Sequence, residues 1–322
     1  MKINCIIPST CAQRVIPYLK NCIASLRKSS ATTQVDLLIF LITDSRGAKN
    51  PYKSKIDQFL YAGQKPGFSR MNNLAIEAAA TYLSDYFLFI NDDAWVEEDF
   101  LKQFKIFVKN KNPDIVAPLI FEGNKRVIDS FGVEYFTSGY AKNTTSFDIP
   151  TQLAPAACLF VKTSFLLKIK RVYGFCFNEV LYSYLDDVEF SIRARALGAK
   201  IEITKNLVAH HKVSLSSGRR SFFVMYQTYR NILWVIIMTW PLSSILKHVF
   251  SILLVQGWVV FYGLKIHGPS IHTKIIWETV LNLFNLLKLR KKILSSYPAD
   301  FNFEELFSEY AFRTYHGITI KI

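Results

Sequence analysis

YFLFINDDAWVEEDF, residues 86–100, is a short apolar run that leads directly into Asn91, Asp92 and Asp93. Adjacent carboxylates repel each other and raise each other's pKa. A fold tolerates such a pair where a metal ion lies between it and a substrate. Taken alone, an Asp pair after a strand is also common turn chemistry. The stretch therefore predicts a buried strand that ends at a polar site.

Strands and helices alternate on both sides of this stretch. Strands are predicted at 3–8, 35–44, 86–92 and 114–120, and helices at 15–26, 71–83 and 97–109. This alternation is typical of an α/β fold with a mostly parallel sheet that is covered on both faces. Ligands bind at the carboxyl ends of the strands in such sheets. Asp44 and the Asn91–Asp93 segment occupy two of these ends.

The middle of the chain continues the pattern after an irregular segment. Residues 121–155 are rich in Gly, Asn, Thr and Pro and predict hairpins and loops. Residues 154–169 predict a strand followed by a helix. A further helix is predicted within 181–203; it ends at Gly198, a common C-terminal stop, and a strand follows.

Two further sets of polar side chains accompany this helix and strand. Asp186 and Asp187, with Glu189 beyond, lie near the helix start, and His210 and His211 follow later. Mg²⁺ and Mn²⁺ take carboxylate oxygens, Mn²⁺ also accepts imidazole, and an unbound carboxylate nearby can act as a general base. Acids at a helix start are also favourable with the helix dipole alone, and a loop histidine is more often structural than a ligand.

Composition limits the class of protein and its partners. The chain has 322 residues, half of them hydrophobic, and a net charge of +14. Residues 1–211 carry 26 Lys or Arg against 20 Asp or Glu, and residues 212–322 carry 13 against 5. A basic, apolar C-terminal third favours an anionic membrane surface over nucleic acid as a partner. The five cysteines have no paired spacing, which fits a reducing cytosol, and the N-terminus is expected to be a first strand and not a signal peptide.

The apolar C-terminal region predicts helices that lie on a membrane. Val249–Leu264 is free of charged residues for sixteen positions, fewer than the roughly 20 that a spanning helix needs. Pro241 is expected to break the helix before it. Residues 273–294 predict an amphipathic helix that ends in a basic cluster at Lys288–Lys292. In-plane attachment is the prediction; a helical subdomain, a dimer interface and a spanning segment within 245–264 are the alternatives.

The order of the short motifs adds a family resemblance. The chain has, in turn, IIPS, ITDS, GFSRMNNLAI, LFINDDAWVEEDFL, YGFCFNEVLYSYLDDVEFSIRARALGAKI, HKVSLSSG and YRN. Together and in this order they resemble the family-2 glycosyltransferases, and within them the rhamnosyltransferase-like enzymes of bacterial surface polysaccharide synthesis. The resemblance covers residues 3 to about 231.

The resemblance implies a GT-A fold, a Rossmann-like α/β architecture. The catalytic domain would be 1–220, with a nucleotide-sugar-binding half at 1–120 and an acceptor-binding half at 121–220. Residues 221–322 would form a helical, basic and apolar region that associates with the membrane.

The resemblance also implies positions that contact the donor nucleotide. Two segments match strand ends that lie beside the nucleobase, at Pro8, Ser9 and Asp44. A third segment matches the one that lines the nucleotide site, at Gly67, Asn72 and Asn73.

The metal ligands and the base are implied in the same way. Asn91 and Asp93 match the two ends of the family's metal-binding D-x-D element, with Asp92 between them. Asp93 and His211 are the implied ligands of Mg²⁺ or Mn²⁺. Asp187 matches the catalytic base.

Several positions depart from the family pattern. Asp186 stands where relatives have Glu, Asn91 replaces a carboxylate, and the segment 155–157 is Pro-Ala-Ala where relatives often have Gly. His210 beside His211 leaves the choice of ligand open. Further polar candidates, expected to be surface or loop residues, are Asp129, Arg219 and Arg220.

The predicted function is an inverting, metal-dependent glycosyltransferase. Its donor would be a UDP- or dTDP-linked sugar, dTDP-rhamnose among them, and its acceptor a saccharide or polyprenyl-linked saccharide at the cytoplasmic face of the bacterial cell membrane. A homodimer is compatible with this. A nucleotidyltransferase or phosphohydrolase is the alternative enzyme, but PSTCAQRV after the first strand lacks the usual glycines. A non-catalytic membrane scaffold is the third hypothesis.

Overall fold

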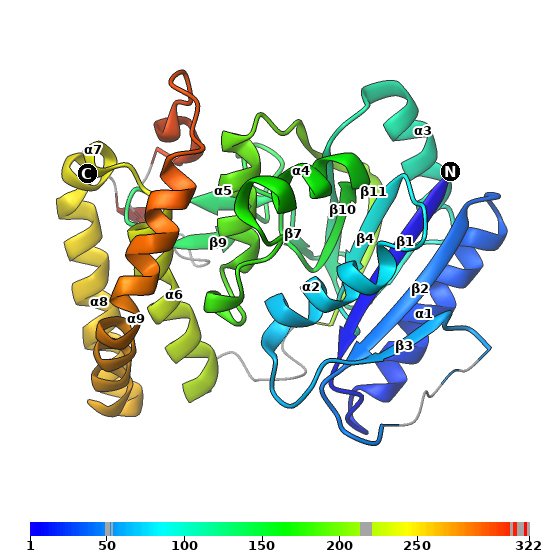
Figure 1. The fold of residues 1–322 in the computed structure, drawn as a ribbon, viewed down its shortest axis with the longest axis horizontal. Coiled ribbons are helices and arrows are strands. Elements are labelled where there is room, and N and C mark those ends of the chain that lie inside the picture. The colour runs from blue at the N-terminus through cyan, green and yellow to red at the C-terminus, as the bar shows by residue number, and fades with distance from the viewer. Residues whose placement is uncertain (49–51, 53, 213–220, 310–311, 314–318, 321–322) are drawn as a thin grey trace.

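A computed structural model describes residues 1–48, 52, 54–212, 221–309, 312–313 and 319–320. Its centre is a mixed sheet in the order β3-β2-β1-β4-β10-β6-β11-β5, with β7 paired to β6 (Figure 1). The strands of this sheet are β1 (Lys2–Ser9), β2 (Asp36–Thr43), β3 (Gln58–Tyr61), β4 (Tyr86–Ile90), β5 (Ala94–Val96), β6 (Ile115–Glu122), β7 (Ile128–Ser130), β10 (Cys158–Lys162) and β11 (Ile201–His211).

Helices cover both faces of the sheet. One face carries α1 (Ile16–Ala31) and α3 (Phe100–Lys111), and its apolar cluster includes Leu19, Phe100 and Phe104. The other face carries α2 (Gly67–Ala79), α4 (Thr163–Tyr173) and α5 (Asp186–Ala196). The α/β class with a two-sided sheet is confirmed.

The expectation of a mostly parallel sheet holds for only half of it. Strands β3, β2, β1 and β4 are parallel, whereas β10 is antiparallel to both β4 and β6, and β5 is antiparallel to β11. A strand buried on both faces shows an apolar run in either direction, so the pattern does not report direction. Despite this mixture, β1, β2, β4, β6 and β11 all end at one edge of the sheet, where β10 begins.

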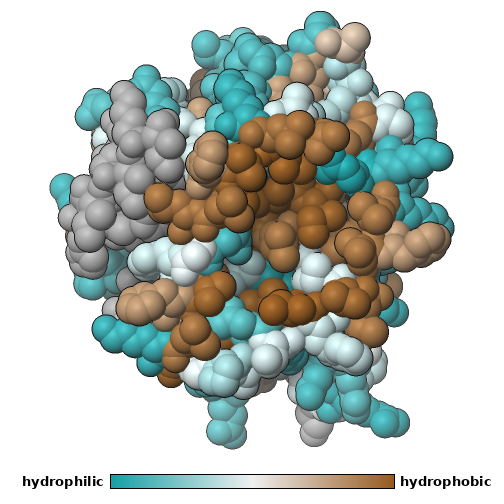
Figure 2. Space-filling model, turned by 90° about the vertical axis from the view of Figure 1, so that its left-hand side faces the viewer, coloured by the Kyte–Doolittle hydropathy of each residue, from teal (hydrophilic) through white to brown (hydrophobic). Residues whose placement is uncertain are grey.

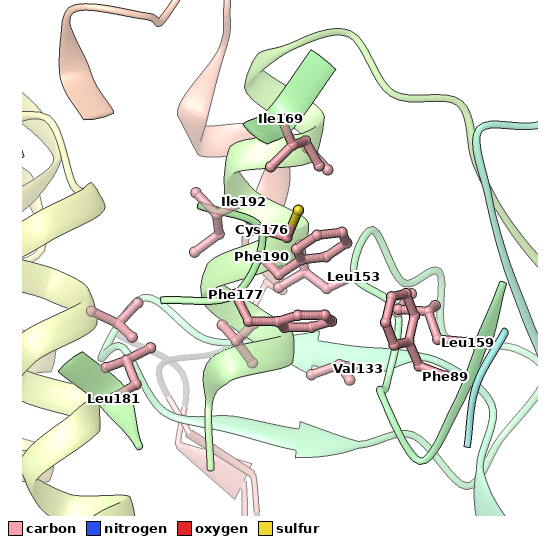
Figure 3. Close-up of a cluster of buried hydrophobic side chains, with 14 of the residues drawn as sticks. Phe89, Val133, Leu153, Leu159, Ile169, Cys176, Phe177, Leu181, Phe190 and Ile192 are labelled. Atoms are coloured by element: carbon pink, nitrogen blue, oxygen red, sulfur yellow. The ribbon is translucent and has the colours of Figure 1, made fainter. Parts of the chain in front are cut away.

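Aromatic side chains fill the core beneath this edge. Phe89 of β4 meets Phe177 edge to face at 5.1 Å, and Phe177 stacks on Phe190 of α5 at 5.0 Å (Figure 3). All three are fully buried, and each such side chain contributes on the order of 1.5–3 kcal/mol by leaving water. The core therefore fixes the start of α5 against the end of β4.

Helices of the C-terminal region pack against the same core. They are α6 (Phe222–Thr239), α7 (Leu242–Lys247), α8 (Val249–His267) and α9 (Ser270–Leu294). One continuous buried cluster runs from the sheet through α6 to Val259 of α8 and Ile275 of α9. Pro241 separates α6 from α7, as predicted. The proposed boundary near residue 220 stays a prediction.

The structure also has several short elements. They are the hairpin β8 (Val133–Tyr135) and β9 (Ala141–Asn143), the pair β12 (Phe312–Arg313) and β13 (Thr319–Ile320), and the 3-10 helices η1 (Glu179–Leu181) and η2 (Phe303–Leu306).

Helix α8 is the one candidate membrane span among the described residues. Its 19 residues are long and apolar enough to cross a bilayer, by length and composition only. Only 28% of its apolar window is buried inside the protein, so the helix is mostly an exposed apolar surface.

Candidate active site

A cavity of about 560 Å³ opens at the edge where the strands end. It is lined by loops that follow β1, β2 and β4, by the loop that precedes β10, and by the starts of α2, α5 and α6. Of the residues that the sequence singled out, the cavity brings together Pro8, Ser9, Asp44, Gly67, Asn91, Asp92, Asp93, Asp186, Asp187 and His211.

Asp93 and His211 meet because two short strands pair. Strand β5, which the sequence did not predict, places Ala94 opposite His211 at the end of β11. His211 Nε2 lies 3.1 Å from Asp93 Oδ1, and both side chains are largely buried. The antiparallel pairing therefore builds one wall of the cavity from residues 118 positions apart in the chain.

Asp129 completes this contact from behind the histidine. Its Oδ2 lies 3.2 Å from His211 Nδ1, and its side chain is 14% exposed. Burial opposes protonation of His211, but the hydrogen bonds to Asp129 and Asp93 outweigh it and raise the pKa of His211 to about 9. Asp129 was expected to be a surface or loop residue, and that expectation is wrong.

His210 points away from this wall. Successive side chains of a strand face opposite sides, and His210 stacks on Trp95 with ring centroids 5.4 Å apart. Its Nε2 lies 2.7 Å from Glu97 Oε1, and its Nδ1 lies 2.9 Å from the carbonyl oxygen of Gly123. His211 is thus the histidine at the cavity.

Asp92 and Asn91 line the cavity beside this wall, directly after β4. Burial, helped by the charge of Asp93, raises the pKa of Asp92 to about 7, although a hydrogen bond with Ser9 opposes the shift. Asn91 Nδ2 lies 3.5 Å from His211 Nε2. A carboxyl group with a pKa near neutrality is a group that a nearby cation would ionise.

Asp186 and Asp187, at the start of α5, line the same cavity. Asp187 accepts hydrogen bonds from the backbone N–H of Val188 at 2.9 Å and of Ala156 at 3.3 Å. Burial raises the pKa of Asp187, and these two donors oppose the rise. Burial and the charge of Asp187 raise the pKa of Asp186 further. The two backbone donors favour the ionised form of the Asp187 carboxyl group.

Glu189 has no part in the cavity. It is fully buried and paired with Arg193 one turn along α5, with Nη2 and Oε2 2.7 Å apart. Arg193 also donates to the carbonyl oxygen of Cys176. This ion pair holds the segment before α5 and belongs to the core.

Asn72 and Asn73 are also outside the cavity lining. Asn72 is fully buried and donates to the carbonyl oxygen of Phe68. Asn73 binds both the N–H and the C=O of Phe177 and donates to Glu179. Asn73 therefore holds the segment that leads to α5, and we do not propose either asparagine as a nucleotide contact.

Position 67 requires a glycine because the ring of Tyr182 lies close to its backbone. Its φ is +75°, and a Cβ there would lie 2.6 Å from the ring of Tyr182. Helix α2 begins at this residue, four positions before its predicted start, so that its first turn faces the cavity.

The loop that touches Gly67 is strained. Tyr182, Tyr184 and Leu185 have φ of 67°, 68° and 56°, and each costs on the order of 1–3 kcal/mol for a residue with a side chain. All three line the cavity. The sequence carries no signal for this conformation, since Tyr and Leu rarely adopt it.

The cavity wall fits a divalent cation only in part. Among the described residues, no group of three or more His, Cys, Asp or Glu side chains is arranged to hold a metal ion. Asp93 and His211 converge with ligand atoms of the types that Mn²⁺ accepts. The hydrogen bond that His211 Nδ1 donates to Asp129 leaves His211 Nε2 facing Asp93. These two side chains suit an ion that takes its other ligands from a substrate and water.

Two sets of residues singled out from the sequence lie outside the residues that the structure describes. Most of the HKVSLSSG loop, together with Arg219 and Arg220, falls within 213–220.

The sequence itself matches nothing closely. No protein-family model matches it, and a search of curated proteins finds no relative.

Solved structures are nevertheless similar across most of the chain. S. aureus TarS residues 1–349 in complex with UDP-GlcNAc superposes with a TM-score of 0.50 and 18% identity, over 95% of this chain and 84% of that one. GalNAc-T7 with UDP, GalNAc and Mn²⁺ superposes with a TM-score of 0.56 and 13% identity, over 75% of this chain and 48% of that one. The mannosyltransferase PcManGT from Pyrobaculum calidifontis with GDP-Man and Mn²⁺ superposes with a TM-score of 0.52 and 10% identity, over 91% of this chain and 85% of that one.

A longer S. aureus TarS structure superposes with a TM-score of 0.52 over 96% of this chain. This chain spans about half, 51%, of the length of that TarS chain. At these identities the likeness establishes the fold. The chain has the GT-A fold, shared with the glycosyltransferases TarS, GalNAc-T7 and PcManGT.

Proposed function

We propose that this protein is an inverting glycosyltransferase that uses a nucleotide-diphosphate sugar. The observation that carries the proposal is the set of side chains in the cavity: Asp93 and His211 meet at 3.1 Å, and the buried carboxyl group of Asp187 lines the same cavity. Structural neighbours were solved with UDP-GlcNAc, with UDP and Mn²⁺, and with GDP-Man and Mn²⁺.

The nucleotide is proposed to lie along the carboxyl ends of β1 and β2 and the start of α2. Pro8, Ser9, Asp44 and Gly67 line this side. A pyrimidine offers an N–H that a carboxylate at Asp44 can accept, which suits UDP- or dTDP-linked sugars, dTDP-rhamnose among them. Asn91 and Asp92 lie between this side and the histidine wall.

Asp93 and His211 are proposed to hold Mg²⁺ or Mn²⁺ together with the diphosphate. When bound, the ion neutralises the charge that develops on the leaving diphosphate. Asp129 holds the imidazole so that Nε2 faces the cavity. The protein's own part in leaving-group departure is therefore to fix this carboxylate and this imidazole.

Asp187 is proposed to take the proton of the acceptor hydroxyl. Its raised pKa, caused by burial, brings it closer to the pH at which a general base works best. The acceptor oxygen then bonds to the anomeric carbon as the bond to the diphosphate breaks. One direct displacement inverts that carbon.

The acceptor is proposed to be a saccharide, free or linked to a polyprenyl lipid, in bacterial cell-surface polysaccharide synthesis. Helices α7, α8 and α9 expose large apolar side chains together, as Figure 2 shows on the side of the molecule that carries α8. The most exposed are Leu246, Phe250, Phe261, Trp277 and Phe284. Residues 242–294 carry seven Lys or Arg and one Glu.

An apolar face with basic flanks fits an anionic leaflet. We therefore propose peripheral attachment at the cytoplasmic face of the cell membrane, with the acceptor lipid in the same leaflet. A homodimer through this face is the competing arrangement.

A thermal-shift screen tests the donor assignment. UDP-, dTDP- and GDP-linked sugars are each added to the full chain with Mn²⁺, with Mg²⁺ and with EDTA. A rise in melting temperature for one nucleotide family that needs the metal supports the proposal. No metal-dependent shift with any nucleotide sugar would remove it.

A further inference from the structure

The YRN motif, residues 229–231, is not used by the chemistry proposed above. It lies in α6, at the point where this helix crosses the segment that leads into α5. Arg230 is 5% exposed and Asn231 is fully buried. Both side chains reach the backbone of residues 181–185, hereafter the α5 entry loop.

Asn231 makes the densest contact with this loop. Its Nδ2 donates to the carbonyl oxygens of Leu181, Ser183 and Tyr184 at 2.9, 2.8 and 2.8 Å. Its Oδ1 accepts from Arg230 Nε and Nη2, both at 3.0 Å. Three carbonyls on one side and a guanidinium on the other allow only this orientation of the amide.

Arg230 is itself held by several neighbouring groups. It donates to the carbonyl oxygen of Leu181 at 3.0 Å and to Gln227 at 2.7 Å. It is paired with Glu278 of α9 at 3.0 Å, and its guanidinium lies 4.2 Å from the ring centroid of Trp234. The guanidinium that orients Asn231 therefore has little freedom to move.

The loop that these side chains hold is strained and lies at the cavity. Three of its five residues have positive φ without being glycine. It also bonds to the start of α2, where the N–H of Ser69 donates to Tyr182 O and the N–H of Phe68 donates to Ser183 Oγ. Asp186 and Asp187 follow it without an intervening residue.

We propose that Asn231 is a positioning residue for the transfer reaction: it holds the α5 entry loop in its strained conformation and so sets the place of Asp187 across from the donor. The two N–H groups of the Asn231 amide, shared among three carbonyl oxygens, stabilise a conformation that the loop's own residues disfavour. Release of the loop moves Asp187 and the rings of Tyr182 and Tyr184 together. The inference rests on the proposed role of Asp187.

Two substitutions test it, beside a matched control. Asn231→Asp keeps the size and the acceptor for Arg230 but sets a carboxylate against three carbonyls. Asn231→Ser is the milder change and keeps one donor. Tyr297→Phe is the control, because it removes a 2.8 Å side-chain bond to the carbonyl oxygen of Thr239 at the far end of the same helix.

The readouts separate positioning from general stability. Hydrogen exchange of the substrate-free protein follows the amides of residues 181–189, several of which donate to backbone carbonyl oxygens in or next to the loop. Release of nucleoside diphosphate, with the donor chosen by the thermal-shift screen, gives kcat and KM. We expect faster exchange confined to this segment, kcat lower by about 100-fold, and donor KM within about threefold for both Asn231 variants, because the ends of β1, β2 and β4 are untouched.

Three results would overturn the inference. The first is exchange at 181–189 equal to that of Tyr297→Phe. The second is kcat within twofold of that control. The third is faster exchange spread over α6 and the sheet, which would give Asn231 a structural role only. Full activity of Asp187→Asn would instead remove the proposed function, while the exchange data would still report on the loop.

Discussion

Asp187 is the residue on which the proposed transfer chemistry depends most. Its carboxyl is buried at a helix start, with two backbone donors. We expect Asp187→Asn to fold normally and to lose about 100- to 10,000-fold in kcat, since it removes a general base. Product formation by the purified variant measures this, with thermal unfolding as the check on folding. Asp186→Asn is the neighbouring control, and a loss equal to or larger than that of Asp187→Asn would move the base to Asp186.

Asp129 makes a separate prediction at the same scale. A carboxylate behind a metal-binding histidine fixes its tautomer, and its removal weakens metal binding by about 10- to 100-fold. We expect this for Asp129→Ala in Mn²⁺ titrations followed by electron paramagnetic resonance, without nucleotide. Glu97→Ala removes the equivalent carboxylate from His210, which faces away, and is expected to change nothing. Equal Mn²⁺ affinity in the two variants would contradict this role.

Residue types and motif order predicted most of the acidic side chains and the histidine that line the cavity, but not the residues that support them. Asp44, Asp93 and Asp187 follow or precede buried runs, and that signal is local. Asp129 lies in a polar segment and meets His211 only through the pairing of β7, β6 and β11. Asn231 sits in an apolar helix pattern. Their roles depend on tertiary contacts that no local pattern records.

At the scale of elements, the apolar runs predicted the long strands and helices within a few residues. Strand β5 was missed because three residues are too few to show a period. The predicted helix within 181–203 begins only at Asp186, because the α5 entry loop has positive φ where the sequence shows helix-compatible residues.

Glu304 of η2 joins the C-terminal segment to α7 and its flank. It accepts from Ser244 Oγ and Lys247 Nζ, both at 2.7 Å, and lies 2.8 Å from His248 Nε2. Burial alone would raise its pKa, but Lys247, Ser244 and His248 outweigh burial and lower the pKa of Glu304 from 4.5 to about 2. A lowered pKa contributes stability above the unfolded value, which is lost as pH falls toward 2.

We therefore expect Glu304→Gln to lower the free energy of unfolding at pH 7 by about 1–2 kcal/mol, after allowing for its partial exposure. Urea unfolding from pH 7 to pH 3 measures this, and the gap to wild type should narrow below about pH 4.5. Glu305→Gln is the control, because Glu305 bonds only to Asn302 among the contacts given by the structure. A gap that stays constant with pH would contradict the ion-pair account.

At the scale of the whole molecule, the catalytic edge and the apolar face belong to one body. The buried cluster runs without a break from the sheet through α6 to α8 and α9. Composition predicted a basic and apolar C-terminal region, and exposed side chains on α7–α9 are consistent with it. Membrane attachment itself stays a proposal, because composition and exposure do not identify what covers this face.

Liposome flotation tests that proposal. Full-length protein is expected to float with vesicles of phosphatidylglycerol and phosphatidylcholine and to do so less at high salt. Phe250→Glu with Phe284→Glu should abolish flotation, since these side chains are 75% and 84% exposed on α8 and α9. Leu83→Glu, at 86% exposure away from this face, is the control. A protein that never floats but becomes monomeric on the double substitution would assign the face to a homodimer.

The central claim is a metal-dependent nucleotide site at Asp93 and His211, and titration calorimetry of UDP and dTDP tests it most directly. Wild type is expected to bind one of these nucleotides at least about tenfold more tightly with Mn²⁺ than with EDTA. Asp93→Ala should retain the weak binding seen in EDTA and lose the gain from Mn²⁺. Equal affinity with and without Mn²⁺ in wild type, or an undiminished gain in Asp93→Ala, would contradict the account.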